Sequence, residues 1–170
     1  MFSKSPLFFI LGLPRSRTAW LSAFISQSGV FCHHEAINGC SSMVEYKNKV
    51  GNCGDSTTGF SYLDIKQNFP NTKILVIKKN QMEFNRACEW SFNALGYNLR
   101  DELALMDEEL SAFDAMVINQ DTISHNLKQI WQYLVDVKWH DKYALIDNLN
   151  IQMDVDCLDA DKMVTFNATI

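Results

Sequence analysis

The segment Leu7–Ser28, LFFILGLPRSRTAWLSAFISQS, decides the fold that we predict for this chain. Leu7–Leu11 is a continuous apolar run, which is typical of a strand covered on both faces in a parallel sheet. Gly12 allows a sharp turn, and Pro14 fixes a φ angle suited to the start of a helix. The first turn of that helix is expected at Arg15–Thr18. Its apolar face carries Trp20, Leu21, Phe24 and Ile25.

The start of this helix is a predicted anion site. Its free backbone N–H groups and the positive end of its dipole attract negative charge. Arg15 and Arg17 add full positive charges, and Ser16 and Thr18 add hydroxyl donors. We therefore expect a phosphate or a sulfate there. The alternative is an ordinary strand, turn and helix with a basic start.

The loop after the first strand lacks the second Gly and the Lys of the common ATP and GTP loop, G-x-x-x-x-G-K-[ST]. GLPRSRTAWL instead resembles the 5′-phosphosulfate loop of the sulfotransferase family, written G-x-P-[RK]-S-G-T-x-[WL]-L after a hydrophobic strand. Arg17 stands where the family has Gly, and its side chain either crowds the phosphate or contacts it. The resemblance implies 3′-phosphoadenosine 5′-phosphosulfate as the cofactor. The implied binding residues are Gly12, Pro14, Arg15, Ser16, Arg17, Thr18, Ala19 and Lys79.

Lys79 enters this set through a second segment, FPNTKILVIKKNQMEF. The segment predicts a strand at Lys73–Ile77, a basic loop, and a helix with Phe84, Ala87, Cys88, Ser91, Phe92 and Leu95 on one face. It resembles the sulfotransferase signature in which an Arg and a Ser hold the 3′-phosphate. Lys79 occupies the Arg position without the bidentate fork, and Ala87 occupies the Ser position without a hydroxyl. The alternative is that Lys78 and Lys79 are a solvated pair at a helix start.

The catalytic hypothesis rests on the segment Cys32–Glu35, CHHE. Sulfuryl transfer needs a base near the acceptor hydroxyl and positive charge near the leaving phosphate. Related bacterial sulfotransferases use a Glu shortly after the first helix as the base, which implies that role for Glu35. His34 is an alternative base or a partner, and Arg15 is the clamp on the transferring group. The other interpretation has His33 or His34 half buried beside the sheet and Glu35 paired with a loop arginine.

We predict that the acceptor is contacted by His33, Asp55 and Ser56. Asp55 and Ser56 lie in the Gly-rich segment 50–60, which we expect to bring a loop or a strand end to the same edge of the sheet. An Asx-type turn in a surface loop is the alternative. Cys32–Glu35 and Cys40 lack a standard zinc spacing, so no metal site is predicted.

The rest of the chain predicts further alternation of strands and helices. We expect an extended piece at 30–37 beside the first strand, a strand at Met116–Asn119, and helices at Ser41–Lys49, Asp101–Phe113 and Asp141–Asn148. A further helix is expected to be capped by Asp121 or Thr122, and its buried face carries Ile123, Leu127, Ile130, Trp131 and Leu134. An irregular acidic tail is expected from Ile151. This order predicts an α/β fold, a three-layer sandwich around a central parallel sheet with ligands at the carboxyl ends of its strands. MVINQDTISHNLKQIWQYL also resembles a later sulfotransferase segment, and the resemblance implies the P-loop NTPase-like version of this fold. Trp90, Trp131 and Trp139 are expected to be packing residues, while Trp20 is either core or a wall of the cofactor site.

Length and charge restrict the class of protein. The 170 residues predict a single domain, 1–170, and the net charge of −5 disfavours binding to nucleic acid. No apolar run reaches the roughly 18 residues that a membrane span needs, so we expect a cytoplasmic protein. Five cysteines without a CxxC pair favour reduced thiols over disulfides.

The predicted function is transfer of sulfate from the nucleotide to a small hydroxylated acceptor, with no prediction of oligomeric state. One alternative is a degenerate nucleotide- or phosphate-binding protein without catalysis. The other is a small phosphotransferase of the nucleotide-kinase kind, although the loop lysine of those enzymes is missing. The chain, with its KYALIDNLNIQMD segment, also resembles sulfotransferase-like proteins of phage and prophage origin.

Overall fold

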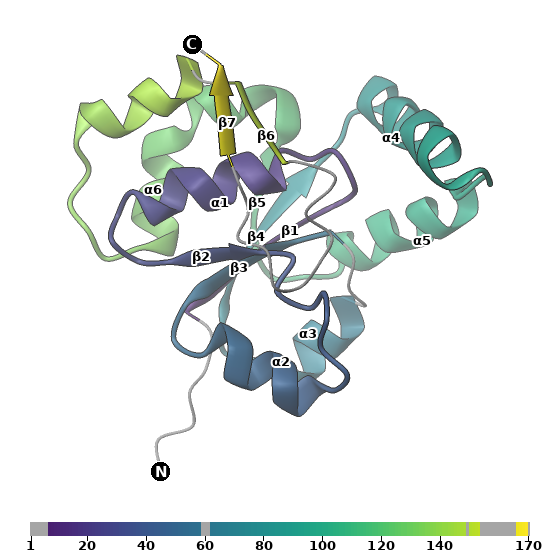
Figure 1. Cartoon of the computed structure of the whole chain (residues 1–170), viewed down its shortest axis with the longest axis horizontal. Helices are drawn as coiled ribbons and strands as arrows, with labels where there is room; N and C mark the ends of the chain where they lie inside the picture. The colour runs from purple at the N-terminus through teal and green to yellow at the C-terminus, as the bar shows by residue number, and fades with distance from the viewer. Residues whose placement is uncertain (1–6, 59–61, 149, 154–165, 170) are drawn as a thin grey trace.

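Five parallel strands form the central sheet of the protein. The computed structural model describes residues 7–58, 62–148, 150–153 and 166–169. The strands are β1 (Phe8–Gly12), β2 (Cys32–His34), β3 (Gly54–Thr57), β4 (Lys73–Lys78) and β5 (Met116–Asn119). They lie in the order β2-β3-β1-β4-β5, and every pairing is parallel (Figure 1). All five strands therefore end at the same edge of the sheet.

Helices cover both faces of this sheet. They are α1 (Thr18–Ser26), α2 (Met43–Val50), α3 (Tyr62–Asn68), α4 (Gln81–Leu95), α5 (Arg100–Ser111) and α6 (Leu127–Leu134), with 3₁₀ helices η1 (Gln120–His125) and η2 (Asp141–Asn148). Side chains of a strand alternate between faces, so Phe8 and Ile10 pack against α1 and α6. Phe9 and Leu11 pack against α2, α3 and α5 on the other face. This confirms the predicted three-layer α/β fold, whereas the assignment of 1–170 to one domain stays a prediction.

The expected place of the strand in residues 30–37 is wrong. β2 does not lie beside β1, because β3 lies between them and pairs with both. The sequence Gly54–Thr57 is polar, yet Asp55, Ser56 and Thr57 are fully buried. Their polar groups bond to other parts of the protein, which is why a polar segment forms an inner strand.

The predicted start of the first helix is also wrong. α1 begins at Thr18, and Arg17 is its N-cap with a left-handed backbone at φ 59°. Arg15 is left-handed as well, at φ 65°. Residues 13–17 therefore form a turning loop rather than the first helical turn. The predicted apolar face is confirmed, since Trp20, Leu21, Phe24 and Ile25 are buried.

The C-terminal third differs from the prediction in three ways. Neither Asp121 nor Thr122 caps a helix, because η1 occupies that segment and α6 begins after Asn126. The segment Asp141–Asn148 has its predicted bounds but is 3₁₀. Part of the expected irregular tail is the strand β6 (Asn150–Met153), which pairs antiparallel with β7 (Phe166–Thr169). The remainder of that tail and Cys157 lie outside the described residues. Among the described helices, none is long and apolar enough to cross a membrane.

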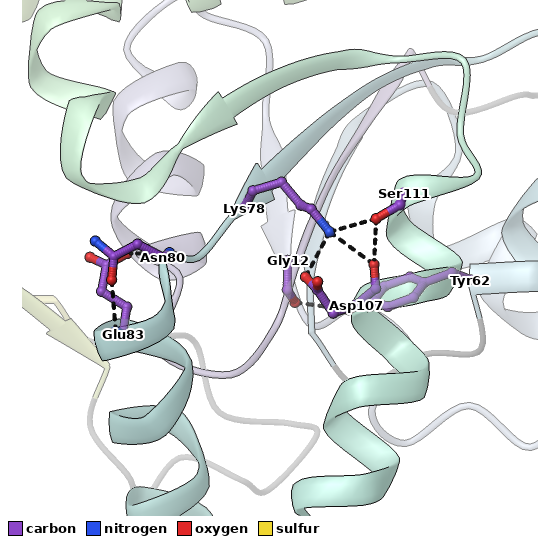
Figure 2. A network of polar contacts seen from close by, with 7 residues as sticks. All are labelled: Gly12, Tyr62, Lys78, Asn80, Glu83, Asp107 and Ser111. Atoms are coloured by element: carbon purple, nitrogen blue, oxygen red, sulfur yellow. Dashed lines mark hydrogen bonds and ion pairs between the residues drawn. The ribbon is translucent and has the colours of Figure 1, made fainter.

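α4 begins with a capping box at the end of β4. The Asn80 side chain accepts a hydrogen bond from Glu83 N, and the Glu83 carboxylate accepts one from Asn80 N (Figure 2). Ala87, Cys88 and Ser91 form its buried face. Phe92 and Leu95, which we predicted on the same face, are not buried, because both residues are more than half exposed. Trp90 is also exposed rather than packed.

We expect Asn80→Ala to destabilise the protein by about 1 kcal/mol, because it leaves backbone N–H groups at the start of α4 without their acceptor. Urea denaturation followed by circular dichroism measures the change. Asn93→Ala is the matched control, since Asn93 is exposed in the last turn of the same helix, far from the capping box, and alanine has the higher helix propensity. Equal losses in the two variants would contradict the role of the capping box.

Candidate anion-binding site

The loop between β1 and α1 turns tightly around the start of α1. A Cβ atom at Gly12 would lie 2.9 Å from Ser16 Cβ and 3.3 Å from Ile77 Cβ, so only glycine fits there. The Gly12 carbonyl accepts a hydrogen bond of 2.8 Å from the buried Tyr62 hydroxyl (Figure 2). Left-handed backbone costs a non-glycine residue about 1–2 kcal/mol, and the loop bears this cost at Arg15 and Arg17. Such strain is typical of ligand-binding loops.

Buried polar atoms without a partner surround the start of α1. Within the described part of the chain, Ser16 Oγ, Trp20 Nε1 and His34 Nδ1 make no hydrogen bond. Ser16 is fully buried in the loop. A buried polar group left unsatisfied costs about 1–3 kcal/mol, so these atoms are suited to bind a polar ligand or water.

Lys79, which directly follows β4, contacts both the loop and the residue that follows β5. Its Nζ donates to the Arg15 carbonyl at 2.9 Å and to Gln120 Oε1 at 2.5 Å. Burial lowers the pKa of Lys79 to about 8, with the charge of Glu83 opposing this shift and that of Arg15 adding to it. Lys79 thus contacts the loop backbone directly.

Lys78, its neighbour in sequence, has a different environment. Its Nζ forms an ion pair of 2.8 Å with Asp107 and donates to Ser111 Oγ at 2.7 Å on α5 (Figure 2). The two lysines are therefore not a solvated pair.

The two loop arginines differ in their contacts. Arg15 is exposed, and its guanidinium lies 6.0 Å from the ring centroid of Trp90 on α4. Among the described residues Arg15 forms no ion pair. The Arg17 guanidinium lies over the Trp20 ring at 4.2 Å and forms an ion pair of 3.1 Å with Asp147. Arg15 thus offers an uncompensated positive charge.

Glu35 follows β2 and has a left-handed backbone at φ 55°. Its carboxylate accepts hydrogen bonds from Thr57 Oγ1 at 2.7 Å and from Thr58 N and Oγ1 at 2.6 and 2.7 Å. A carboxylate has about four acceptor positions, so these bonds fix its orientation and leave room for one more donor.

The histidines before Glu35 are partly buried and neutral at pH 7. His34 Nε2 lies 3.2 Å from Thr18 Oγ1 on α1. Burial lowers the pKa of His34, and the negative charge of Glu35 partly opposes this shift. Burial and the charge of Lys49 lower the pKa of His33. The His33 and Phe31 rings form a T-shaped pair with their centroids 4.7 Å apart.

Asp55 and Ser56 are held inside the sheet. Ser56 Oγ donates to the Thr18 carbonyl at 2.9 Å. Asp55 accepts hydrogen bonds from the Tyr46 hydroxyl at 2.6 Å and from Ala36 N at 3.2 Å. Both residues are 0% exposed, so we do not include them in the acceptor site. In the described ranges, no group of three or more His, Cys, Asp or Glu is arranged to hold a metal ion.

Several residues around the loop were not predicted from the sequence, and they are Tyr62, Trp90, Gln120, Ser124 and Asp147. Gln120 directly follows the predicted strand Met116–Asn119. The rule that ligands bind at the carboxyl ends of parallel strands would have included it. No comparable signal marks Ser124 or Asp147.

Comparison with known proteins supports the fold. No protein-family model matches the chain, and no curated protein matches its sequence. Among solved structures, a sulfotransferase from Alicyclobacillus acidocaldarius matches at 12% identity with a TM-score of 0.58, over 89% of this chain and 87% of that one. At this identity the likeness shows that the two chains share an overall α/β fold, and the chemistry has to be argued from the residues of the site.

Proposed function

We propose that this protein binds 3′-phosphoadenosine 5′-phosphosulfate at the loop between β1 and α1 and transfers its sulfo group to a small hydroxylated acceptor. The observation that carries the proposal is the fully buried, unpartnered Ser16 hydroxyl, which lies in a strained loop before a helix of nine residues. A phosphate or sulfo oxygen is a suitable partner for such a group. The likeness to a solved sulfotransferase supports this choice of ligand.

In the proposed complex the loop residues bind and orient the nucleotide. The backbone from Gly12 to Ala19, with Pro14 at the turn, surrounds the 5′-phosphosulfate, and the hydroxyls of Ser16 and Thr18 donate to it. Arg15 supplies the free positive charge. Lys79 holds the Arg15 carbonyl, so we assign it a positioning role in the loop in addition to its charge.

The proposed transfer forms one S–O bond and breaks another. The acceptor hydroxyl oxygen attacks sulfur, the bond between sulfur and the 5′-phosphate oxygen breaks, and adenosine 3′,5′-bisphosphate leaves with the electron pair. The acceptor proton passes to the Glu35 carboxylate, which Thr57 and Thr58 orient. His34 is the alternative base, since its buried ring is neutral. Arg15 and the start of α1 stabilise the charge that develops on the leaving phosphate.

A second candidate function is nucleotide binding without transfer. Ala87 is fully buried where a phosphate-binding hydroxyl would stand, and Lys79 already binds Arg15 O and Gln120. Both observations favour weaker recognition of the 3′-phosphate.

Thermal unfolding with added nucleotide tests the proposal. Adenosine 3′,5′-bisphosphate is expected to raise the melting temperature more than ATP does, because the site has no loop lysine for ATP. A ligand at 100 times its Kd stabilises the folded state by about 2.7 kcal/mol. Arg15→Ala should remove this shift, while Arg100→Ala, an exposed arginine at the start of α5, should retain it.

The outcomes separate the functions. Equal shifts with both nucleotides, or no shift, would refute the proposed ligand. Binding without sulfate transfer to a panel of hydroxylated acceptors would favour the second candidate. If transfer occurs, Glu35→Gln should keep the melting shift and lose the turnover.

A further inference from the structure

The Arg17 side chain joins the loop to two segments far along the chain. Its Nη2 forms the ion pair of 3.1 Å with Asp147 Oδ1 on η2, and its Nη1 donates to Ser124 Oγ on η1 at 3.3 Å. Ser124 Oγ in turn donates to the same Asp147 oxygen at 2.8 Å. The stacking of Arg17 on Trp20 completes this network. The loop, η1 and η2 are thus connected through one guanidinium.

The ion pair is open to solvent and therefore to competing ions. The side chains of Arg17 and Asp147 are 32% and 31% exposed. Arg17 is also the N-cap of α1, next to the backbone groups that the proposed anion would contact. An anion at the loop and the Asp147 carboxylate have the same sign of charge, and both are attracted to this guanidinium.

We propose that Asp147 competes with the anion in the loop for Arg17, so that anion binding and the attachment of η2 oppose one another. This inference rests on the proposed function only in taking the loop as an anion site. Two ligands that share one group with like charges lower each other's affinity by the same factor. A bound anion therefore weakens the contact of Arg17 with η2, and loss of the Asp147 charge strengthens anion binding.

The isosteric variant Asp147→Asn separates charge from shape. Its amide oxygen still accepts from Arg17 and Ser124, while the negative charge is gone. We expect its affinity for adenosine 3′,5′-bisphosphate and for sulfate to rise about 1.5- to 5-fold, the range for a partly exposed ion pair. Asp141→Asn is the matched control, because Asp141 lies on the same 3₁₀ helix and bonds to Trp139. Its affinities should equal those of the wild type.

The experiment is a double-mutant cycle measured by isothermal titration. Asp147→Asn should increase affinity when Arg17 is present and have no effect in the Arg17→Ala background. Hydrogen exchange of residues 141–148, measured with and without sulfate, supplies a readout that needs no nucleotide. Exchange there should increase when sulfate binds to the wild type.

Each outcome decides the inference. Unchanged or lower affinity in Asp147→Asn overturns it, and so does a gain that persists without Arg17. If neither anion changes exchange at 141–148, the inference also fails. If sulfate gives the expected results but the bisphosphate does not bind, the proposed function fails and the inference stands.

Discussion

Gly54→Ala is expected to cause a large loss of stability. A Cβ at Gly54 would lie 2.1 Å from both Cε2 and Cζ of Phe8. The two residues are direct partners on β3 and β1, and the Phe8 ring is fully buried. β3 pairs on both sides, so it has no free edge toward which to move. Overpacking of a core costs about 1–3 kcal/mol and sometimes more, and we expect a loss of about 3 kcal/mol or more.

Urea denaturation followed by circular dichroism measures this loss, and a second substitution tests its cause. Phe8→Leu shortens the side chain that the new methyl group meets. The double variant Phe8→Leu with Gly54→Ala should therefore be more stable than Gly54→Ala alone, although Phe8→Leu alone is destabilising. A double variant as unstable as the sum of the two single changes would refute the steric explanation.

The same contact illustrates which parts of the fold the sequence predicts. β1, β4 and β5 were predicted because the sequence signal is local, in the form of a short apolar run followed by turn or cap residues. The amphipathic face of α1 is local as well. In each of these elements, the apolar residues of the element itself indicate which of its side chains are buried.

For β3 the sequence left a loop and a strand end as alternatives, because the burial of this segment depends on partners elsewhere in the chain. Asp55 needs the Tyr46 hydroxyl, and Ser56 needs the Thr18 carbonyl. A hydrophobicity pattern contains no information on such bonds, so Gly54–Thr57 resembles a surface loop in sequence. The error in the place of β2 followed from this ambiguity, because the inner position belongs to β3.

The residues of the candidate site also fall into two groups, those that the sequence identifies and those that only the structure brings to the site. The residues of the loop were found because their chemistry is contiguous in sequence. The partners of Arg17 lie 107 and 130 residues away in sequence, and only the folded chain brings them together. The left-handed backbone at Arg15 and Arg17 was missed because non-glycine residues seldom adopt it. A local rule of backbone preference therefore fails at this strained loop, which agrees with the proposal that the loop binds a ligand.

The second large effect concerns the buried carboxyl of Asp55. Burial raises its pKa from 3.8 to about 7, the hydrogen bonds from Tyr46 and Ala36 oppose the shift, and the charge of Glu35 adds to it. Because the folded-state pKa is raised, the folded protein binds more protons than the unfolded chain between these two values. Stability from this group is therefore complete below pH 3.8 and is lost as the pH rises toward about 7. The loss is of the order of 4 kcal/mol over that window.

Asp55→Asn is expected to remove this loss. The asparagine oxygen can accept from Ala36 N, and its amide can donate to the Tyr46 oxygen, which keeps both contacts but reverses the direction of the hydrogen bond with Tyr46. The variant should be more stable than the wild type at pH 8 and of similar stability near pH 4. Urea denaturation across this pH range measures the difference between the two proteins.

Comparison between variants is essential because other groups titrate in the same range. The pKa values of His33 and His34 are lowered by burial, so these residues contribute stability that increases with pH and opposes the effect of Asp55. They are present in both proteins and cancel in the difference.

Asp64→Asn, which changes an exposed carboxylate on α3, should leave the pH dependence of the wild type unchanged. Tyr46→Phe removes a hydrogen bond that lowers the pKa of Asp55, so the loss of stability should extend to higher pH. A constant difference between Asp55→Asn and the wild type from pH 4 to 8 would show that Asp55 keeps one protonation state throughout, and would refute this explanation.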